Sequence, residues 1–267
     1  MRLLALLGLY IPFLGATLSA AEISVVGGLT REATVRPGET TGGSLLVRNN
    51  ADEPTTVRAY VRDYLFYADG TNLYGDPGST PRSNARWLKF SPEQFTIQPG
   101  DALAVRYTMD VPDDSTLTGT YWSILLVERV GVALAEPEAG RTPQAGVRVV
   151  VRYGIQLVTH IGDTGARAIS FIDKRVITQD GKRVLRLDIE NTGERWVNPL
   201  VWVELFGEDG LSVGRLQAGR KRMFAGCSAR FDVDLSELPA GGYSALIVAD
   251  NGDDHVFGSE QQELDLR

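Results

Sequence analysis

The sequence has very little cysteine and histidine, two residue types on which much catalytic and metal chemistry depends. It holds one cysteine, Cys227, and two histidines, His160 and His255, which lie far apart in the chain. No H-x-x-H, C-x-x-C or H-E-x-x-H spacing occurs, so no zinc site is expected. The G-x-S-x-G elbow, the P-loop and the G-x-G-x-x-G turn are missing as well. We therefore predict a protein that is not an enzyme and needs no cofactor.

With a single cysteine the chain cannot form an internal disulfide, so its folding must depend on the burial of apolar side chains alone. Cys227 lies in FAGCSARFDV, which is typical of a small buried residue at the start of a strand. An intermolecular link or a reactive thiol is the alternative. Acidic residues outnumber basic ones, 34 to 27, so the formal net charge is −7 and the pI is about 5.0. This balance argues against nucleic acid and anionic membrane surfaces as partners.

Long apolar runs are missing except at the N-terminus. There the basic start MR is followed by LLALLGLYIPFLG and then by the small residues ATLSAA. This order predicts a cleaved signal peptide over residues 1–21, because the apolar run is short for a bilayer span. An uncleaved anchor is the alternative, which Pro12 and Gly15 disfavour. We expect a periplasmic or otherwise extracytoplasmic protein with no membrane span in its mature chain.

Amphipathic helical periodicity is missing too, and short alternating runs take its place. GSLLVRNN, TTVRAYVRDYLFY, TYWSILLVERV and LVWVELFG alternate with a period of two and are separated by turns rich in Gly, Pro, Asn and Asp. Such strands predict an all-β protein with two immunoglobulin-like β-sandwich domains in tandem. We place the first domain in residues 22–160 and the second in residues 161–267, joined near HIGDTGA. In both domains a strand ends in Asn (VRNN and IENTG) before a polar turn.

The segment VRVVVRYGIQLVT, residues 147–159, raises the main functional question. Its odd positions from Val147 to Leu157 are apolar, which suits a strand that closes its own sandwich or one that is offered to another protein. Two long irregular segments, residues 68–86 and 131–146, are typical of functional or disordered loops. The second of these directly precedes the strand and favours an offered strand.

This layout, together with several short motifs, resembles the PapD-like periplasmic pilus chaperones, with the differences expected of a divergent member. The motifs are the RPGE turn, LLVRNN, RWLKFSPEQFTIQPGDALAVRY and TGTYWSILLVE. The layout agrees over nearly the whole mature chain, and the motifs lie in the first domain. In that family the strand after a flexible loop completes a pilus subunit that lacks its own last strand.

The resemblance implies a chaperone-like protein that binds pilus or other secreted subunits by donating the strand of residues 147–157. An outer-membrane usher would be a further partner. The donor residues would be Val147, Val149, Val151 and Tyr153. Main-chain hydrogen bonds would then supply affinity, and the alternate side chains would fill the gap in the subunit's core.

The resemblance also implies two basic residues that hold the terminal carboxylate of the subunit. The position late on the donor strand falls on Gln156, which carries no charge and cannot form an ion pair. The position on the first strand falls near Ala33, with Arg31 and Arg36 as neighbours, and Arg152 is a candidate substitute. Either the partner is held differently, or the protein is a relative that no longer handles pilins.

A structural or adhesive tandem β-sandwich protein of the cell envelope is the alternative function. On that interpretation, loops such as residues 68–86 bind a surface protein or a polymer, and the strand near residue 150 is an ordinary core strand. Trp122 and Trp202 lie within alternating strands, so we expect them to pack in the core rather than to stack on carbohydrate.

The best metal candidate is the turn DNGDD, whose Asp250, Asp253 and Asp254 carry the hard oxygen ligands that calcium prefers. Its spacing departs from that of a calcium-binding loop. We therefore favour a plain hairpin turn and predict no metal site.

Overall fold

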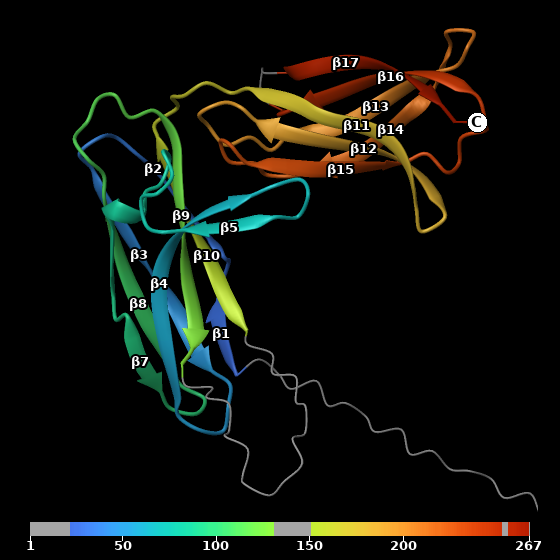
Figure 1. The fold of residues 1–267 in the computed structure, drawn as a ribbon. Helices are drawn as coiled ribbons and strands as arrows, with labels where there is room; N and C mark the ends of the chain where they lie inside the picture. Colours follow the sequence, from blue (N-terminus) through green and yellow to red (C-terminus); the bar gives the residue numbers. More distant parts are fainter. Residues whose placement is uncertain (1–21, 131–150, 253–255, 267) are drawn as a thin grey trace, which may run out of the picture.

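The computed structural model describes residues 22–130, 151–252 and 256–266, and within these ranges the chain forms two β-sandwiches in tandem (Figure 1). The helical element within them is a single 3₁₀ turn, η1 (Ala85–Trp87), and no helix in these ranges is long and apolar enough to cross a membrane. The predicted fold class, all-β with two immunoglobulin-like sandwiches, is confirmed.

The first sandwich consists of two sheets that pack face to face. One sheet has the strand order β1-β3-β8-β6, and the other has the order β2-β10-β9-β4-β5, with β7 also paired to β4. The first sheet contains β1 (Ile23–Val26), β3 (Thr40–Asn49), β8 (Ala102–Asp110) and β6 (Leu88–Ser91). The second contains β2 (Thr30–Val35), β10 (Arg152–Ile161), β9 (Gly119–Arg129), β4 (Thr55–Phe66), β5 (Asn72–Gly75) and β7 (Gln94–Ile97).

Alternate apolar side chains form the core between these sheets. Leu45 and Val47 of β3 and Leu125 and Val127 of β9 are completely buried. Successive side chains of a strand point to opposite faces, so each strand offers one set of positions to this core. Burial of each such side chain contributes about 1.5–3 kcal/mol, which is how a chain without disulfides can hold this fold.

The chain crosses from one sheet to the other between its first two strands. β1 pairs with β3 in one sheet, and β2 pairs with β10 in the other. The crossing occurs at Gly27 and Gly28, and Gly27 has a φ of 95°, a conformation that glycine adopts readily. As a result β1 and β2, which follow each other in the chain, lie in different sheets, and the residues between them belong to neither strand.

The second sandwich has the sheets β11-β12-β15 and β14-β13-β16-β17. Their core is lined by residues such as Leu185, Leu187, Phe231 and Ile247, all completely buried. The turn QDGK joins β11 to β12, with Asp180 and Gly181 at positive φ. The strands are β11 (Ile169–Gln179), β12 (Lys182–Asn191), β13 (Leu200–Phe206), β14 (Ser212–Arg220), β15 (Ser228–Asp234), β16 (Gly242–Asp250) and β17 (Val256–Asp265).

The two asparagines that end corresponding strands make the same contacts in both sandwiches. Asn49 and Asn191 are completely buried. Each side chain accepts a hydrogen bond from the backbone N–H two residues on and donates to the carbonyl four residues on, at Glu53 and Arg195 respectively. The repeated sequence pattern therefore marks one turn that is built twice.

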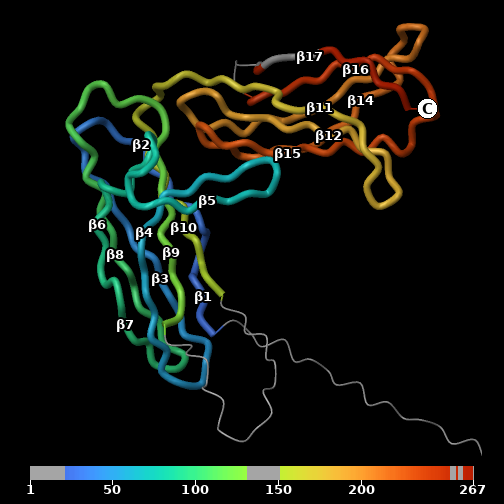
Figure 2. Tube along the Cα trace, viewed as in Figure 1, coloured from blue at the N-terminus to red at the C-terminus, as the bar shows by residue number. Residues whose placement is uncertain are grey.

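The two sandwiches meet at an interface that we call the elbow, formed by Trp122, Val158, Phe224, Ala225 and Cys227. Figure 2 shows the chain bending there, with the hairpin of β4 and β5 reaching towards β15 of the second sandwich. At the tip of that hairpin the N–H of Ala68 donates to Ser228 Oγ over 2.9 Å. The bend is thus held by apolar packing and by hydrogen bonds between the domains.

Candidate functional site

Strand β10 is paired along its whole length on one side and along only part of it on the other. β9 runs antiparallel to it from Arg152 to Ile161, whereas β2 runs parallel to it from Gln156 onward. Within the described ranges no strand pairs with Arg152–Ile155 on the side away from β9. The pairing on that side begins where the N–H of Gln156 donates to the carbonyl of Leu29 over 2.8 Å.

The odd positions of β10 point into the chain's own core. Ile155, Leu157 and Ile161 are almost completely buried there. Tyr153 is partly buried against the same core, and its hydroxyl donates to the carbonyl of Ile23 over 2.9 Å. Tyr153 therefore connects β10 to β1 of the facing sheet, and from this residue onward the strand closes its own sandwich.

Of the predicted donor residues, Val147 and Val149 lie outside the described residues. Val151 comes directly before β10 and is 41% exposed. Two more large aliphatic side chains are exposed on the segment of this protein that links β1 to β2, Val26 at 44% and Leu29 at 45%. Unpaired strand backbone beside exposed aliphatic side chains is the arrangement to which an extended chain adds.

We call this feature the open edge: the backbone of Arg152–Ile155 with the side chains of Val26, Leu29 and Val151. In Figure 1, β1 and the beginning of β10 lie side by side at the end of the first sandwich that is remote from the elbow. Neither Val26 nor Leu29 was predicted from the sequence. The only sign of them in the sequence is an apolar residue on each side of the Gly27–Gly28 pair.

Three charged residues form a row across the outer face of the sheet beside the open edge. Arg58 of β4 is in register with Glu128 of β9, and Glu128 is in register with Arg152 of β10. The Glu128 side chain is only 8% exposed, and it is ion-paired with both arginines, to Arg152 Nε at 2.6 Å. The Tyr60 hydroxyl donates to the same carboxylate over 3.2 Å.

The surroundings keep Glu128 ionised. Burial raises the pKa of its carboxyl, but the hydrogen bonds from Arg58 and Arg152 outweigh burial, so the pKa lies below its usual range. Arg58, Arg62 and Arg152 also surround the ring of Tyr60, at 4.9, 5.8 and 5.9 Å from its centroid. Together with Val61, Tyr74 and Leu126 these residues line a cavity of about 420 Å³.

The structure does not bring the predicted carboxylate anchors together. Gln156 lies opposite Thr30, while Arg31 lies opposite Leu157, one position further along the strand. The Arg31 guanidinium donates to the carbonyls of Gly28 and Thr30. Arg36 lies in the turn after β2, and Arg152 is engaged by Glu128, so none of the predicted arginines faces Gln156.

An ionic cluster near the elbow was not predicted from the sequence. Arg222 of the second sandwich forms a two-pronged ion pair with Glu32 of β2, with 2.8 Å between Nη2 and Oε2. His160 of β10 contacts the same carboxylate over 3.2 Å and the Thr120 hydroxyl over 3.0 Å. Trp196 lies under the Arg222 guanidinium, 4.1 Å from its ring centroid.

This cluster shifts the pKa values of its members. The hydrogen bond from Arg222 is the main cause that lowers the pKa of Glu32 to about 2. Burial lowers the pKa of His160, which therefore stays neutral at pH 7 despite the carboxylate beside it. Glu32 and Arg222 are separated by 190 positions in the chain, so no local pattern could reveal the pair.

The loop of residues 68–86 is built around a buried carboxylate. Asp63 is 1% exposed and accepts hydrogen bonds from the N–H groups of Gly78 and Thr80, at 3.1 and 2.8 Å. The hydroxyls of Ser79 and Ser83 donate to it as well. Burial alone would raise the pKa of Asp63. The four hydrogen bonds outweigh burial, so the pKa lies below its usual range. The loop is thus an ordered part of the first sandwich.

The remaining candidates have structural surroundings. Cys227 is completely buried in the elbow, as the sequence predicted, and burial raises the pKa of its thiol to about 11. Asp250 accepts a hydrogen bond from the N–H of Gly252 over 2.8 Å, while Asp253 and Asp254 lie outside the described residues. Within the part of the chain that is described, no group of three or more His, Cys, Asp or Glu side chains could hold a metal ion.

Trp202 corrects one expectation about the core. It is only partly buried and lies under the guanidinium of Arg215, which is 3.8 Å from its ring centroid. The neighbouring Val201 and Val203 face the core instead. The alternation of β13 is present, but its core face carries Val201 and Val203 and its outer face carries Trp202.

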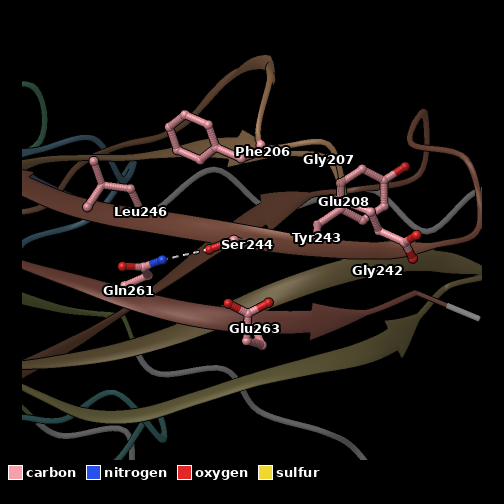
Figure 3. Close-up of a pocket in the computed structure, with 10 residues that line it drawn as sticks. Phe206, Gly207, Glu208, Gly242, Tyr243, Ser244, Leu246, Gln261 and Glu263 are labelled. Carbon is pink, nitrogen blue, oxygen red and sulfur yellow. Dashed lines mark hydrogen bonds between the residues drawn. The ribbon is translucent and has the colours of Figure 1, made fainter.

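A groove of about 710 Å³ lies on the second sandwich (Figure 3). Phe206 and Leu246 project into it, and Gln261 donates to Ser244 Oγ on its floor over 3.0 Å. Glu208 and Glu263 stand at its rim. It lies on the outer face of β13, β16 and β17, away from the open edge.

The fold and the open edge define the class of this molecule: a tandem β-sandwich protein with an incompletely paired strand in its first sandwich. No protein-family model and no curated protein matches the sequence.

Several solved structures are similar to it. One is a chaperone–tip adhesin complex of CFA/I fimbriae, with a TM-score of 0.47 and 10% identity, covering 91% of this chain and 98% of that one. Another is the CsuC–CsuE chaperone–tip adhesion subunit complex of Acinetobacter baumannii, with a TM-score of 0.44, 14% identity and coverage of 91% and 98%. A third is the SafA pilin with the SafB chaperone of Salmonella enterica, with a TM-score of 0.40, 14% identity and coverage of 92% and 98%. The similarity is one of fold.

Proposed function

We propose that this protein is a periplasmic chaperone-like protein that binds secreted protein subunits, pilin-like ones among them, by β-strand pairing at the open edge. The observation that carries the proposal is the backbone of Arg152–Ile155, which no strand of the described residues pairs on the side away from β9, beside the exposed side chains of Val26, Leu29 and Val151. An extended segment of a partner gains main-chain hydrogen bonds from the first feature and apolar contacts from the second. Release from the signal peptide of residues 1–21 would place the protein where such subunits pass.

The proposal assigns different roles to the apolar residues at the beginning of β10 and to those further along it. Tyr153, Ile155 and Leu157 complete the chain's own core. Val151 precedes that core and is 41% exposed, which leaves its side chain for the core of a partner. Tyr153 accordingly belongs to the core of the first sandwich, and the proposed donor residues are Val147, Val149 and Val151. An outer-membrane usher remains a proposed further partner.

We also propose that the partner's terminal carboxylate is not held by an arginine beside Gln156. The neighbours of Gln156 on the outer face of β2 are Thr30, which is opposite to it, and Glu32, which follows two positions on. Glu32 is already paired with Arg222. A carboxylate brought to this position would meet a carboxylate, so a basic anchor must come from elsewhere in the site.

The variant Val151→Glu tests the proposal. It places a charge at the start of the open edge, so the protein should keep its thermal midpoint but lose binding of a purified secreted subunit. Leu211→Glu is the matched control, because Leu211 is 68% exposed in the turn between β13 and β14 and lies on the other sandwich. Hydrogen exchange supplies an independent measurement: a bound subunit should slow amide exchange in residues 152–155.

Two results would reject strand pairing. One is a Val151→Glu protein that binds every tested subunit as the Leu211→Glu control does. The other is a bound subunit that leaves amide exchange in residues 152–155 unchanged. If shortening the hairpin tip at residues 69–71 abolished binding instead, the alternative of an adhesive loop would replace the proposal.

A further inference from the structure

We infer that a strand which pairs with the open edge carries an aspartate or glutamate opposite Arg152. This inference rests on the proposed function, because it concerns the chemistry of the strand that the edge receives. It names one position of that strand and the charge that the position must have.

The register of the sheet leads to this position. Arg58, Glu128 and Arg152 lie directly opposite one another on β4, β9 and β10, so charges of alternating sign cross the sheet in one row. Opposite charges in directly facing positions of a sheet stabilise pairing, and like charges destabilise it. Among the residues that the structure describes the row ends at Arg152, since β2 begins to pair with β10 only at Gln156. The next strand would therefore continue the row with a negative charge.

The exposure and hydrogen bonding of the Arg152 side chain leave it able to pair with a second carboxylate. Its Nε is hydrogen-bonded to Glu128, yet 49% of its side chain is exposed. A guanidinium has five N–H donors in a planar fork that suits a carboxylate, and one bond to Glu128 occupies a single donor. The guanidinium carbon lies 5.9 Å from the ring centroid of Tyr60, on the β9 side of Arg152. Because about half of the side chain is exposed, it can turn towards a carboxylate on the added strand.

The other charges on this face favour an acidic residue too. Glu128 is a single carboxylate shared by two arginines, so the row has an excess of positive charge. A lysine or arginine opposite Arg152 would be repelled.

Arg62 provides a matched control. It lies opposite Ile124, which lies opposite Gln156, which in turn lies opposite Thr30 of β2. The row of Arg62 is therefore already closed by a strand of this chain, and an added strand cannot extend it. Arg62→Glu makes the same change of charge as Arg152→Glu, on the same face, at a place where no partner residue can respond.

The test uses phage-displayed peptides of about ten residues, in which Val or Ile alternates with fully randomised positions. They are selected against the purified protein and its Arg152→Glu, Arg152→Gln and Arg62→Glu variants. The wild-type protein and the Arg62→Glu variant should enrich peptides with Asp or Glu at one fixed position. Arg152→Glu should change that position to Lys or Arg, and Arg152→Gln should remove the preference. A synthetic peptide with Asp there should bind wild type about two- to five-fold more tightly than its Asn counterpart.

Each contrary outcome rejects a defined statement. If alternating apolar peptides are enriched with no charge preference, or with the same preference in wild type and Arg152→Glu, the acidic residue is wrong and strand pairing stands. If no alternating apolar peptide is enriched by any of the proteins, strand pairing at this edge is wrong and the inference is lost with it. Thermal melting shows whether Arg152→Glu, which brings a second carboxylate near Glu128, is folded, and Arg152→Gln tests the same position without that repulsion.

Discussion

Trp122 of the first sandwich stacks on Phe224 of the second, with 4.8 Å between the ring centroids and 15° between the ring planes. Both rings are almost completely buried. The indole N–H of Trp122 donates to the carbonyl of Tyr64 over 2.7 Å, which fixes the ring on the first sandwich. The angle between the two sandwiches thus depends on an aromatic contact that neither could form alone.

Removal of this contact should uncouple the sandwiches. We expect Phe224→Ala to lower the free energy of unfolding by about 3 kcal/mol, the usual cost of deleting a buried aromatic ring. Calorimetry should then show two transitions in place of one, because the contact between cooperative units is lost. Phe206→Ala, in a partly buried outer position, is the control. A Phe224→Ala protein with one transition at the original midpoint would contradict this prediction.

The thiol of Cys227 should be unreactive in the folded protein. It is completely buried, and burial raises its pKa to about 11, so little thiolate exists at neutral pH. Labelling with a thiol reagent should be slow in buffer and should rise with denaturant in parallel with unfolding. Rapid labelling of the native protein, or a disulfide-linked dimer on a non-reducing gel, would show that the thiol is accessible after all.

The ion pair of Glu32 with Arg222 predicts a loss of stability in acid. The pKa of Glu32 is lowered from 4.5 to about 2, so the unfolded chain binds the proton first as the pH falls. The contribution is present above pH 4.5 and is lost between there and pH 2. Because the Glu32 side chain is 39% exposed, we expect about 1 kcal/mol once solvent screening is considered. Urea titrations at several pH values should show a flatter profile for Glu32→Gln, and an unchanged profile would count against the pair.

His160 predicts a separate effect at higher pH. Burial lowers its pKa below 6.5, so the unfolded chain takes up a proton at a pH where the folded protein does not. Stability should therefore be greatest above pH 6.5 and should decrease as the pH falls through and below that value. Nearby Arg222 and Arg195 act in the same direction, and Glu32 acts against it. The measurement is the change in unfolding free energy between pH 7.5 and pH 5.5, which should be smaller in His160→Gln than in wild type.

The buried carboxylate of Asp63 should hold the loop after β5. Asp63→Ala leaves four donors without their acceptor, and we expect a loss of about 3 kcal/mol with faster amide exchange at Gly78 and Thr80. Asp76→Ala, in the same loop but 91% exposed, is the control and should change stability by less than about 0.5 kcal/mol. Equal effects of the two substitutions would show that the loop does not depend on Asp63.

The sequence predicted the fold because alternation and turn residues are local signals. Asn49 and Asn191 are examples, since each is bonded within four residues of itself, and the repeated pattern was visible in the chain. Trp202 shows the limit of that signal: a period of two identifies two faces of a strand without stating which one is inside. The faces are assigned only when the second sheet is in place.

The candidate site could be predicted only in part, for a related reason. The composition of residues 147–157 predicts a strand, but the length over which β2 pairs with that strand depends on where the chain crosses between the sheets at Gly27 and Gly28. The row of Arg58, Glu128 and Arg152 joins residues as much as 94 positions apart. Such contacts depend on register between strands, which the sequence of any one strand does not contain.

The hydrogen bond between Leu29 and Gln156 has a further consequence. An added strand can extend along β10 only until it meets Leu29, because from Gln156 onward that side of the strand is occupied by the protein's own chain. Leu29 is therefore a physical stop. A partner segment that pairs with β10 would have to end or turn away at Leu29. Leu29 would therefore limit how many residues of that segment can pair, whatever their sequence.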